Sequence, residues 1–511
     1  MARLCGLETE YGIQVDGDEG ADVVVESMEL VRACVAGAFV ARWDYRLENP
    51  RRDVRGFVAG SLRNEEDEAA YGARDGQRSI PLPELKSDLV LANGGRLYND
   101  HTHPEYSTPE CRGLLDLVAA DRAGEELLHR GAGRRTAARG LGRVRLFRNN
   151  TDFAGHSYGC HENYLLDRKI PFDAVVEGLL AHLVTRQICW GAGKVGVEGP
   201  AAPADGVHYQ LSQRADFLET VAGIDTMERR PLVNTRDEPH ADPRRYRRLH
   251  LIAGDANMAE YATALKVGTT ALVLDLLEIG ALEPVSLADP VAACRSISRA
   301  PDGPWAVALA DGRRTSALEV QQDLADQASR RFSGRDEETD WVLREWAWTL
   351  AALAAGRREE LVGRLDWVTK RWLLDTFVEV EGLDWERPQD RAWLQAQDLE
   401  YHSIDPAEGL FRLLEGQGGA LRLIDDERVS TAAILGPADT RARFRGQCVA
   451  RFGEAVGTVG WAGLELSWDG QRQTVELEPD LEAARRYSRA IEVATTVAEL
   501  AAAVRAEEGK R

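Results

Sequence analysis

The chain is organised around the sequence Gly95-Arg-Leu-Tyr-Asn-Asp-His-Thr-His-Pro-Glu-Tyr-Ser-Thr-Pro-Glu110. Successive side chains of a strand point to opposite faces, so Arg96, Tyr98 and Asp100 are expected to share one face. A cation, a phenol and a carboxylate side by side do not describe a hydrophobic core. They indicate either a solvated sheet edge or a functional site, and the rest of the chain has to decide between the two.

A pair of carboxylates lies near the N-terminus. The segment Arg3–Val15 alternates like a strand, which puts Glu8 and Glu10 on one face. Like charges at such positions repel each other unless a positive group lies between them. The pattern is compatible with a solvent-exposed face, or with a divalent cation such as Mg²⁺, which carboxylate oxygens bind well.

A third polar strand is predicted after Ser157. His161 lies on one face of it, as a candidate metal or phosphate ligand, and Cys160 lies on the other. Because neighbours in a strand point to opposite faces, a Cys–His nucleophilic dyad is disfavoured.

Arginines follow in two later segments, where Arg236 shares a face with Asn234 and Arg248 with His250. Guanidinium groups bind phosphate oxygens through two parallel hydrogen bonds, so these arginines are candidate ligands for a nucleotide, although a solvated surface remains the alternative. The dipeptide Gly193-Lys194 lacks the spacing of a phosphate-binding loop, and we reject a Walker motif.

Apolar periodicity predicts the helices between these strands. The expected helical segments are Ser27–Ala41, Leu114–His129 closed by Gly131 and Gly133, Phe172–Trp190, Met258–Gly280, and several within Thr315–Leu383. Tryptophans in the last segment are expected to anchor the core, as aromatic side chains at helical spacing usually do; they are Trp341, Trp346, Trp348, Trp367 and Trp372.

These elements predict an α+β fold, in which a curved antiparallel sheet carries the polar side chains on one face and helices on the other. At 511 residues the chain is expected to form more than one domain. We place a catalytic domain at 1–435 and a small C-terminal α/β domain at 436–511, with strands near 463–468 and 474–477 and a helix at 480–508. The charged segment 42–89 is predicted to be a mobile functional loop or disordered.

Composition narrows the class of protein further. The net charge of −21 disfavours nucleic acid as a partner. Seven scattered cysteines without a CxxC pair indicate a reduced compartment. We find neither an apolar signal sequence nor a membrane-spanning run, so a cytoplasmic protein is expected.

Taken together, several motifs resemble the family of Pup ligases and depupylases, enzymes that act on the prokaryotic ubiquitin-like protein Pup and are related to glutamine synthetase. The resemblance covers essentially the whole chain. It is carried by Gly6-Leu-Glu-Thr-Glu-Tyr-Gly12, Gly95-Arg-Leu-Tyr-Asn-Asp100, Asn149-Asn150, Ser157-Tyr-Gly-Cys-His-Glu-Asn-Tyr164, Asn234-Thr-Arg-Asp-Glu-Pro-His-Ala-Asp242 and Tyr246-Arg-Arg-Leu-His250.

Two features resemble the depupylase branch of that family. The segment from Arg42 to Phe57 looks like a loop that ligases shorten, and Asp100 precedes Glu105 by five residues, where ligases typically insert one more. Against this, the residues around Glu8 and around Cys160 are more similar to those of the ligases, and Glu260 is not followed by the expected Ser/Thr pair. An inserted loop outweighs substitutions, so the resemblance implies a depupylase.

The resemblance also implies a glutamine-synthetase-like fold and roles for single residues. Mg²⁺ would be bound by Glu8, Tyr98 and Glu105, with Glu10 and His161 as further ligands. Nucleotide, as ATP or as ADP with phosphate, would contact Arg96, Thr108 and Trp461, beside the arginines Arg236 and Arg248. Asp100 would be the catalytic carboxylate.

The implied activity is hydrolysis of the isopeptide bond between the C-terminal glutamate of Pup and a substrate lysine, together with deamidation of a C-terminal glutamine of Pup. Partners would be Pup and pupylated proteins, and the enzyme is expected to be a monomer. The alternative is an ATP-dependent Pup–protein ligase or a related carboxylate–amine ligase. A nucleotide-binding scaffold without catalysis is disfavoured, because a scaffold has no use for a carboxylate such as Asp100 beside metal ligands.

Overall fold

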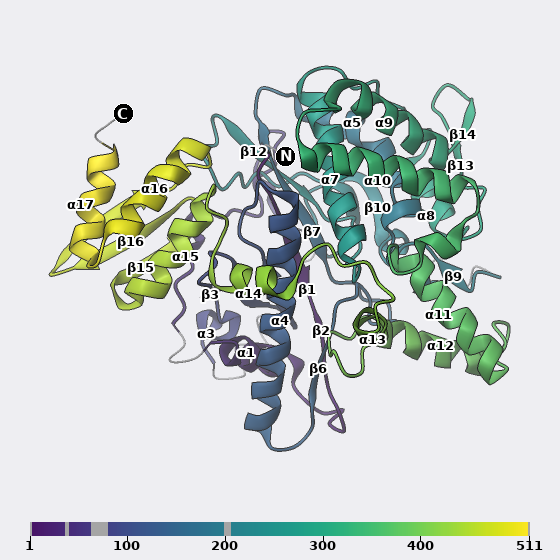
Figure 1. Ribbon diagram of the computed structural model, residues 1–511, viewed down its shortest axis with the longest axis horizontal. Coiled ribbons are helices and arrows are strands. Elements are labelled where there is room, and N and C mark those ends of the chain that lie inside the picture. Colours follow the sequence, from purple (N-terminus) through teal and green to yellow (C-terminus); the bar gives the residue numbers. More distant parts are fainter. Residues whose placement is uncertain (1–2, 36–39, 63–79, 199–205, 509–511) are drawn as a thin grey trace.

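The computed structural model describes residues 3–35, 40–62, 80–198 and 206–508. A six-stranded sheet lies at the centre, helices cover one of its faces, and a smaller α/β unit formed by the end of the chain lies at one side (Figure 1). The mixture of helices with an antiparallel sheet confirms the predicted α+β class.

All neighbouring strands of the central sheet are antiparallel, as predicted. In spatial order the strands are β12 (Tyr246–Leu251), β7 (Cys160–Asp167), β1 (Cys5–Glu10), β5 (His103–Ser107), β4 (Arg96–Asp100) and β3 (Leu89–Val90).

Short two-stranded sheets surround the central one. Their strands are β2 (Gly12–Val15) with β6 (Val144–Phe147), β8 (Lys194–Val195) with β9 (Tyr209–Gln210), β10 (Leu218–Gly223) with β11 (Arg230–Asn234), and β13 (Ala306–Ala308) with β14 (Arg314–Ser316).

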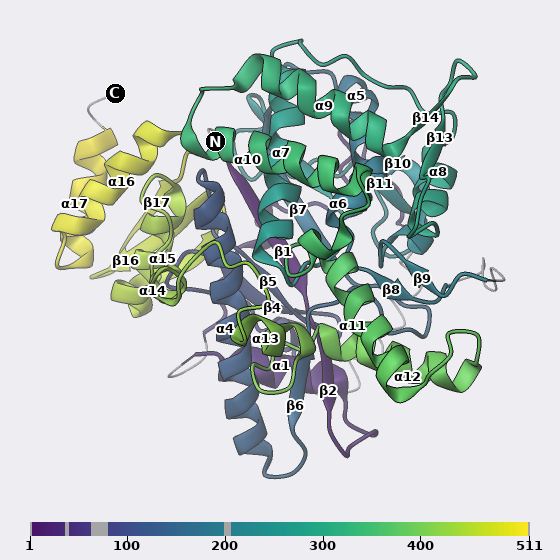
Figure 2. The ribbon, with the colours of Figure 1, turned by 45° about the vertical axis from the view of Figure 1, so that its right-hand side comes forward.

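Helices bury the apolar face of the central sheet. Leu7, Tyr164 and Leu249 point into a hydrophobic core shared with α4, α5 and α7, and α9 and α10 pack behind these helices (Figures 1 and 2). The helices up to residue 354 are α1 (Val23–Ala33), α3 (Leu82–Lys86), α4 (Leu114–Arg139), α5 (Phe172–Thr185), α6 (Gln187–Trp190), α7 (Glu260–Glu278), α8 (Pro290–Ser298), α9 (Ala317–Phe332) and α10 (Glu337–Ala354).

The end of the chain has its own hydrophobic cluster, which contains Val459, Leu466 and Ile491 and also takes in Trp43 and Val90 from the first part of the chain. The predicted boundary near residue 435 lies between two helices, and the division into two domains stays a prediction. The remaining elements are α11 (Asp366–Glu381), α12 (Pro388–Tyr401), α13 (Leu410–Gly416), α14 (Asp426–Ile434), α15 (Arg441–Phe452), β15 (Val456–Gly460), β16 (Gly463–Trp468), β17 (Gln471–Glu476), α16 (Leu481–Val493) and α17 (Val497–Glu508).

The predicted end of the helix that begins at Leu114 was wrong. Helix α4 continues through Gly131 and Gly133 to Arg139, and it ends at Gly140, whose φ of 71° lies in the left-handed region. A Cβ atom on Gly131 would lie 2.3 Å from Sγ of Cys34. Gly131 therefore permits the close approach of the segment that follows α1, a tertiary reason that local sequence does not reveal.

Other boundaries also differ from the prediction. Helix α1 begins four residues before the predicted Ser27, because Asp22 accepts a hydrogen bond from the N–H of Val24 as its N-cap. It ends at Ala33 instead of reaching the predicted Ala41. The strand predicted over Arg3–Val15 is two strands that pair with different partners. The predicted helices 172–190 and 480–508 are each two helices.

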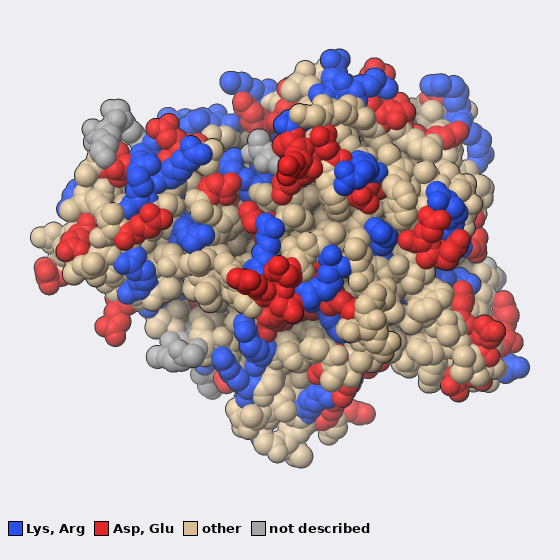
Figure 3. Space-filling view, in the orientation of Figure 1, with Lys and Arg blue, Asp and Glu red and all other residues tan. Residues whose placement is uncertain are grey.

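Of the tryptophans predicted as core anchors, Trp346 and Trp367 are buried and Trp341 and Trp348 are partly buried, but Trp372 is exposed at the surface (45%). All seven cysteines are buried and unpaired. Within the described ranges, no helix combines the length and apolar character needed to cross a membrane. Basic and acidic side chains are interspersed on the face that Figure 3 shows.

Candidate active site

The register of the central sheet brings the predicted polar residues onto one face. Glu8 pairs with His161 on β7 and with Ser107 on β5. One step along, Glu10 pairs with Glu105, and Glu105 pairs with Tyr98 on β4. Because residues two apart in a strand share a face, these side chains form two adjacent rows across the sheet.

The first cluster on this face is acidic. Oxygen atoms of Glu10, Asp100 and Glu105 all lie within 4.8 Å of one another. Burial raises the pKa of Glu105 well above its ordinary value, and the charges of Asp100, Glu10 and Glu8 raise it further. Three carboxyl groups so close together repel one another in the absence of a positive charge, and a hard divalent cation would neutralise them.

The second cluster combines Glu8 with two histidines, His161 and His250, again with ligand atoms within 4.8 Å. Burial opposes ionisation of Glu8, but a hydrogen bond from His161 and the charge of Arg248 outweigh it and lower the pKa of Glu8. Burial also lowers the pKa of His250 well below its ordinary value. A neutral imidazole is the form that binds a metal ion.

His250 is absent from the ligands predicted from the sequence, although the alternation of β12 placed it on the polar face beside Arg248. Its partner across the sheet is Asn163, and its ring lies edge-on to that of His161, with the centroids 4.9 Å apart. The sequence did contain an indication of this role, because His250 follows Arg248 by two residues and therefore shares its face of the strand. Asp100, predicted as the catalytic group, lies among the candidate metal ligands.

A two-residue turn carries Asp100. Asp100 and His103 form the last pair of the β4–β5 hairpin, which leaves His101 and Thr102 as the turn. His101 has a φ of 55°, a left-handed conformation that costs a residue with a side chain some free energy. The five-residue step from Asp100 to Glu105 is thus the shortest hairpin connection.

Two of the predicted phosphate-binding arginines lie at the β12 side of the site. Arg248 donates to Asn163 Oδ1 (2.6 Å) and lies 3.4 Å from Glu8 Oε1. Arg236 follows β11 outside the central sheet and donates to the backbone oxygen of Ile224. Burial is the main cause of the low pKa of His250, and the charge of Arg236 adds to it.

Arg96 differs from an open phosphate ligand. Its buried guanidinium donates to Asp88 Oδ1 (Nε, 2.9 Å) and lies between the rings of Trp43 and Tyr98, 4.2 and 3.9 Å from their centroids. The hydroxyl of Tyr45 also accepts from Arg96 (2.8 Å). The sequence could not indicate these partners, because Trp43 and Tyr45 belong to the segment 42–89.

Hydrogen bonds attach the described part of segment 42–89 to β15 and to Thr235, which follows β11. Near its start, Asp44 donates its N–H to Val459 O in β15 (2.9 Å). Further along, Val54 donates its N–H to Thr235 O, and the Thr235 hydroxyl donates to Asp53 (2.6 Å). Residues 63–79 of the predicted loop 42–89, which include Asn64–Glu68, lie outside the described residues.

A small cavity of about 70 Å³ lies where the sheet meets the C-terminal unit. Glu8, Thr108, Arg248 and Trp461 line it, so four predicted ligands surround one space. The C-terminal unit is held there by Glu110, which forms ion pairs with Arg441 and Arg445. Burial opposes the charge of Glu110, yet these two arginines lower its pKa to about 2.

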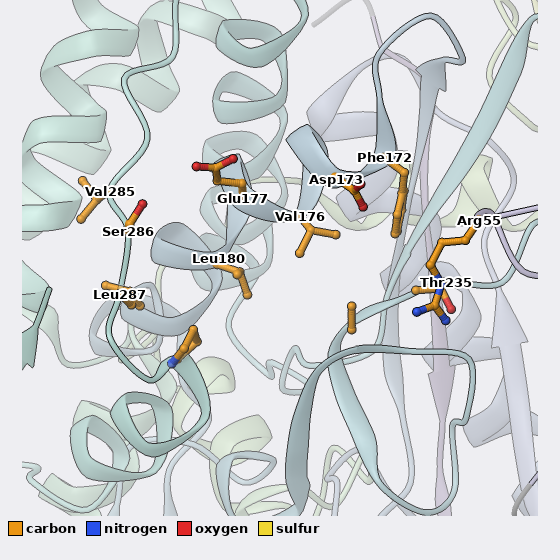
Figure 4. Close-up of a pocket in the computed structure, with 12 residues that line it drawn as sticks. Arg55, Phe172, Asp173, Val176, Glu177, Leu180, Thr235, Val285, Ser286 and Leu287 are labelled. Atoms are coloured by element: carbon orange, nitrogen blue, oxygen red, sulfur yellow. The ribbon is translucent and has the colours of Figure 1, made fainter. Parts of the chain in front are cut away.

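A larger cavity, of about 280 Å³, lies elsewhere, between α5, the β10–β11 pair and residues 285–290 (Figure 4). Its walls are mostly apolar, and they also include the charged residues Asp173, Glu177 and Arg55. None of the residues predicted for the site lines it. Of the two cavities, only the smaller one is lined by residues predicted for the site.

Comparison with known proteins decides the family, since the model described as Pup-ligase protein matches residues 3–465. The chain belongs to the Pup ligase family. A depupylase of Acidothermus cellulolyticus is 42% identical over 496 residues, which is 95% of each chain. A Pup deamidase/depupylase of Mycolicibacterium smegmatis is 40% identical over 94% of this chain and 95% of its own.

Ligases of the same family match a shorter part of the chain. A Pup–protein ligase of Nakamurella multipartita is 42% identical over 416 residues, which is 80% of this chain and 90% of the ligase. The Pup ligase PafA, solved in complex with Pup, superposes with a TM-score of 0.77 and 32% identity over 100% of this chain and 95% of its own. PafA in complex with ADP gives a TM-score of 0.72 and 34% identity over 89% and 95%. These matches confirm the glutamine-synthetase-like α+β fold.

Proposed function

We propose that this protein is a depupylase and Pup deamidase, an amidohydrolase on a carboxylate–amine ligase fold. The observation that carries the proposal is the extent of the matches. Relatives named depupylase or Pup deamidase/depupylase align with 94–95% of the chain, whereas a ligase of similar identity leaves about a fifth unmatched. The partners of the reaction are then Pup and pupylated proteins.

The cofactors we propose are Mg²⁺ and a nucleotide, as ATP or as ADP with phosphate. Glu8, Glu10, Glu105 and His161, joined by His250, supply carboxylate and imidazole ligands of the kinds that bind divalent cations. When bound, the ions would neutralise the acidic face and polarise the oxygen atoms that they contact. The ADP complex of the neighbouring ligase supports the nucleotide.

The remaining predicted ligands have supporting positions. Tyr98 lies directly opposite Glu105, and burial raises the pKa of its phenol well above the ordinary value, so the Tyr98 hydroxyl stays protonated and neutral. Thr108 and Trp461 line the cavity, where the indole offers a flat surface for a base. Arg236 and Arg248 supply positive charge at the β12 side. Arg96 acts through Tyr98, because its guanidinium is already occupied by Asp88.

Asp100 is proposed to act on the carbonyl carbon of the bond that is broken. In the net reaction, water adds its oxygen to the side-chain carbonyl of the last residue of Pup. The carbon–nitrogen bond breaks, and lysine or ammonia leaves with a proton. Asp100 either attacks the carbonyl directly or removes a proton from the water or phosphate that does so. Its position at the tip of the hairpin leaves 38% of its side chain exposed and accessible to a substrate.

The decisive experiment incubates purified protein with Mg–ATP and a pupylated reporter and follows the release of Pup. A parallel incubation supplies Pup ending in glutamate together with an unmodified target protein. Release of Pup supports the depupylase, whereas conjugation without release would identify the ligase alternative. A cytoplasmic location and a monomeric state stay predictions.

A further inference from the structure

The motif that begins at Asn149-Asn150 has no role in the chemistry described so far, and its residues are buried. Asn150 is the centre of a turn. Its Oδ1 accepts from the N–H of Ala256 (2.6 Å), and its Nδ2 donates to Tyr158 O (3.0 Å). Its backbone N–H donates to Gln213 Oε1 (2.6 Å). Every polar atom of the Asn150 side chain is therefore used to fix the segment that carries Tyr158.

This turn is anchored deep in the protein. The amide nitrogen of Gln213 lies 2.9 Å from Nε2 of His402, and the same nitrogen of His402 lies 2.8 Å from Nζ of Lys370. Lys370 forms a buried ion pair with Asp398. These hydrogen bonds and the ion pair are all buried, and they restrain the groups that they join, although Nδ1 of His402 has no hydrogen-bond partner among the described residues. The turn that holds Tyr158 is thus attached to α11 and α12 and not only to the sheet.

Tyr158 connects this turn to the acidic cluster of Glu10, Asp100 and Glu105. Its hydroxyl donates to Asn149 Oδ1, and its ring stacks on the imidazole of His103, with the centroids 4.4 Å apart and the planes 26° apart. His103 is the hairpin partner of Asp100, and its Nδ1 lies 3.7 Å from Glu10 Oε2. The Tyr158 ring therefore packs against the residue that pairs with Asp100 across the hairpin.

We propose that Tyr158 is a positioning residue: its ring fixes His103, and through the two-residue turn it fixes Asp100 relative to Glu10. The hairpin tip needs such a support, because Asp100 is partly exposed and the turn contains the left-handed His101. A displacement of about 1 Å of a reacting group lowers a rate by about 10²-fold. This inference rests on the proposed depupylase activity, since it concerns the rate of that reaction.

Three variants separate positioning from general destabilisation. Tyr158→Phe keeps the stacked ring and loses the hydroxyl, and Tyr158→Leu keeps an apolar side chain without a ring. Tyr261→Ala is the control. It removes a buried tyrosine from α7, in the helical layer, where its hydroxyl lies 2.9 Å from that of Thr349. For each variant kcat and KM of Pup release, nucleotide affinity and Tm are measured.

We expect Tyr158→Leu to lower kcat about 30- to 100-fold. KM and nucleotide affinity should stay within about threefold of the wild type. Tyr158→Phe should keep kcat within about threefold, and Tyr261→Ala should lower Tm while keeping kcat. The inference would be overturned if Tyr158→Leu kept its kcat, or if Tyr158→Phe lost as much as Tyr158→Leu. Absence of Pup release by the wild type would instead overturn the proposed function itself.

Discussion

Replacing Asp100 by asparagine should abolish most of the activity and, without divalent cations, stabilise the protein. The amide keeps the size of the side chain but removes one negative charge from the cluster with Glu10 and Glu105. As a nucleophile or base, Asp100 acts through a negatively charged carboxylate oxygen, and the neutral amide oxygen of asparagine is far less basic and nucleophilic. We expect the rate of Pup release to fall by about 10²- to 10⁴-fold.

The stability effect follows from the distances. Two unit charges 4.8 Å apart repel each other by about 3.5 kcal/mol at an effective dielectric constant of about 20. Asp100 takes part in one such pair, with Glu10, because the raised pKa of Glu105 favours the uncharged form of that carboxyl group. Solvent reaches 38% of its side chain, so screening leaves about 1–2 kcal/mol. In a protein of this size that corresponds to a rise in Tm of about 2 °C.

The assay is thermal unfolding in EDTA and in Mg²⁺, together with Pup release under saturating Mg–ATP. The wild type should gain more Tm from Mg²⁺ than Asp100→Asn, because binding of a cation relieves more repulsion in the wild type. Asp326→Asn makes the same chemical change on the exposed side of α9 and serves as the control. Retention of more than a tenth of the wild-type rate, or a Tm in EDTA no higher than that of the wild type, would refute this reasoning.

Three further outcomes are expected. Glu110→Gln should lower stability by about 3 kcal/mol at pH 7, since it leaves Arg441 and Arg445 without their carboxylate. Because the pKa of Glu110 is lowered to about 2, this contribution is present above pH 4.5 and is lost as the pH falls toward 2, which acid unfolding of both proteins measures. Trp461→Ala should weaken nucleotide binding by about 1–3 kcal/mol in calorimetry and leave Mn²⁺ binding unchanged. His101→Gly should raise Tm, because glycine adopts the left-handed conformation at φ 55° without strain. An unchanged or lower Tm would contradict the proposal that His101 is strained.

The alternation of strand side chains allowed much of the site to be predicted. Glu8, Glu10, Tyr98, Asp100 and His161 needed only the two-residue period to be placed on one face, and the sheet confirms that placement. Their roles as ligands and catalyst stay proposals.

What the sequence could not give were contacts between distant segments. The guanidinium of Arg96 donates to Asp88 and lies over the ring of Trp43. Glu110 forms an ion pair with Arg441 of the C-terminal unit. All of these contacts arise from tertiary packing. Gly131 illustrates the same point. In the sequence, a glycine at this place indicates the end of a helix, but in the structure it leaves room for the side chain of Cys34. Sequence patterns predict local geometry. The contacts of Arg96, Glu110 and Gly131 depend instead on which distant segments pack together.

The two-residue turn at His101 restricts how this family of chains can change in length. An odd insertion within β4 or β5 would move every later side chain of that strand to the opposite face, and a carboxylate such as Glu105 would enter the hydrophobic core. At the turn itself, an added residue leaves both strands in register and alters only the place of Asp100. A change in the length of this turn would therefore move Asp100 while leaving Glu10 and Glu105 on the same face of the sheet.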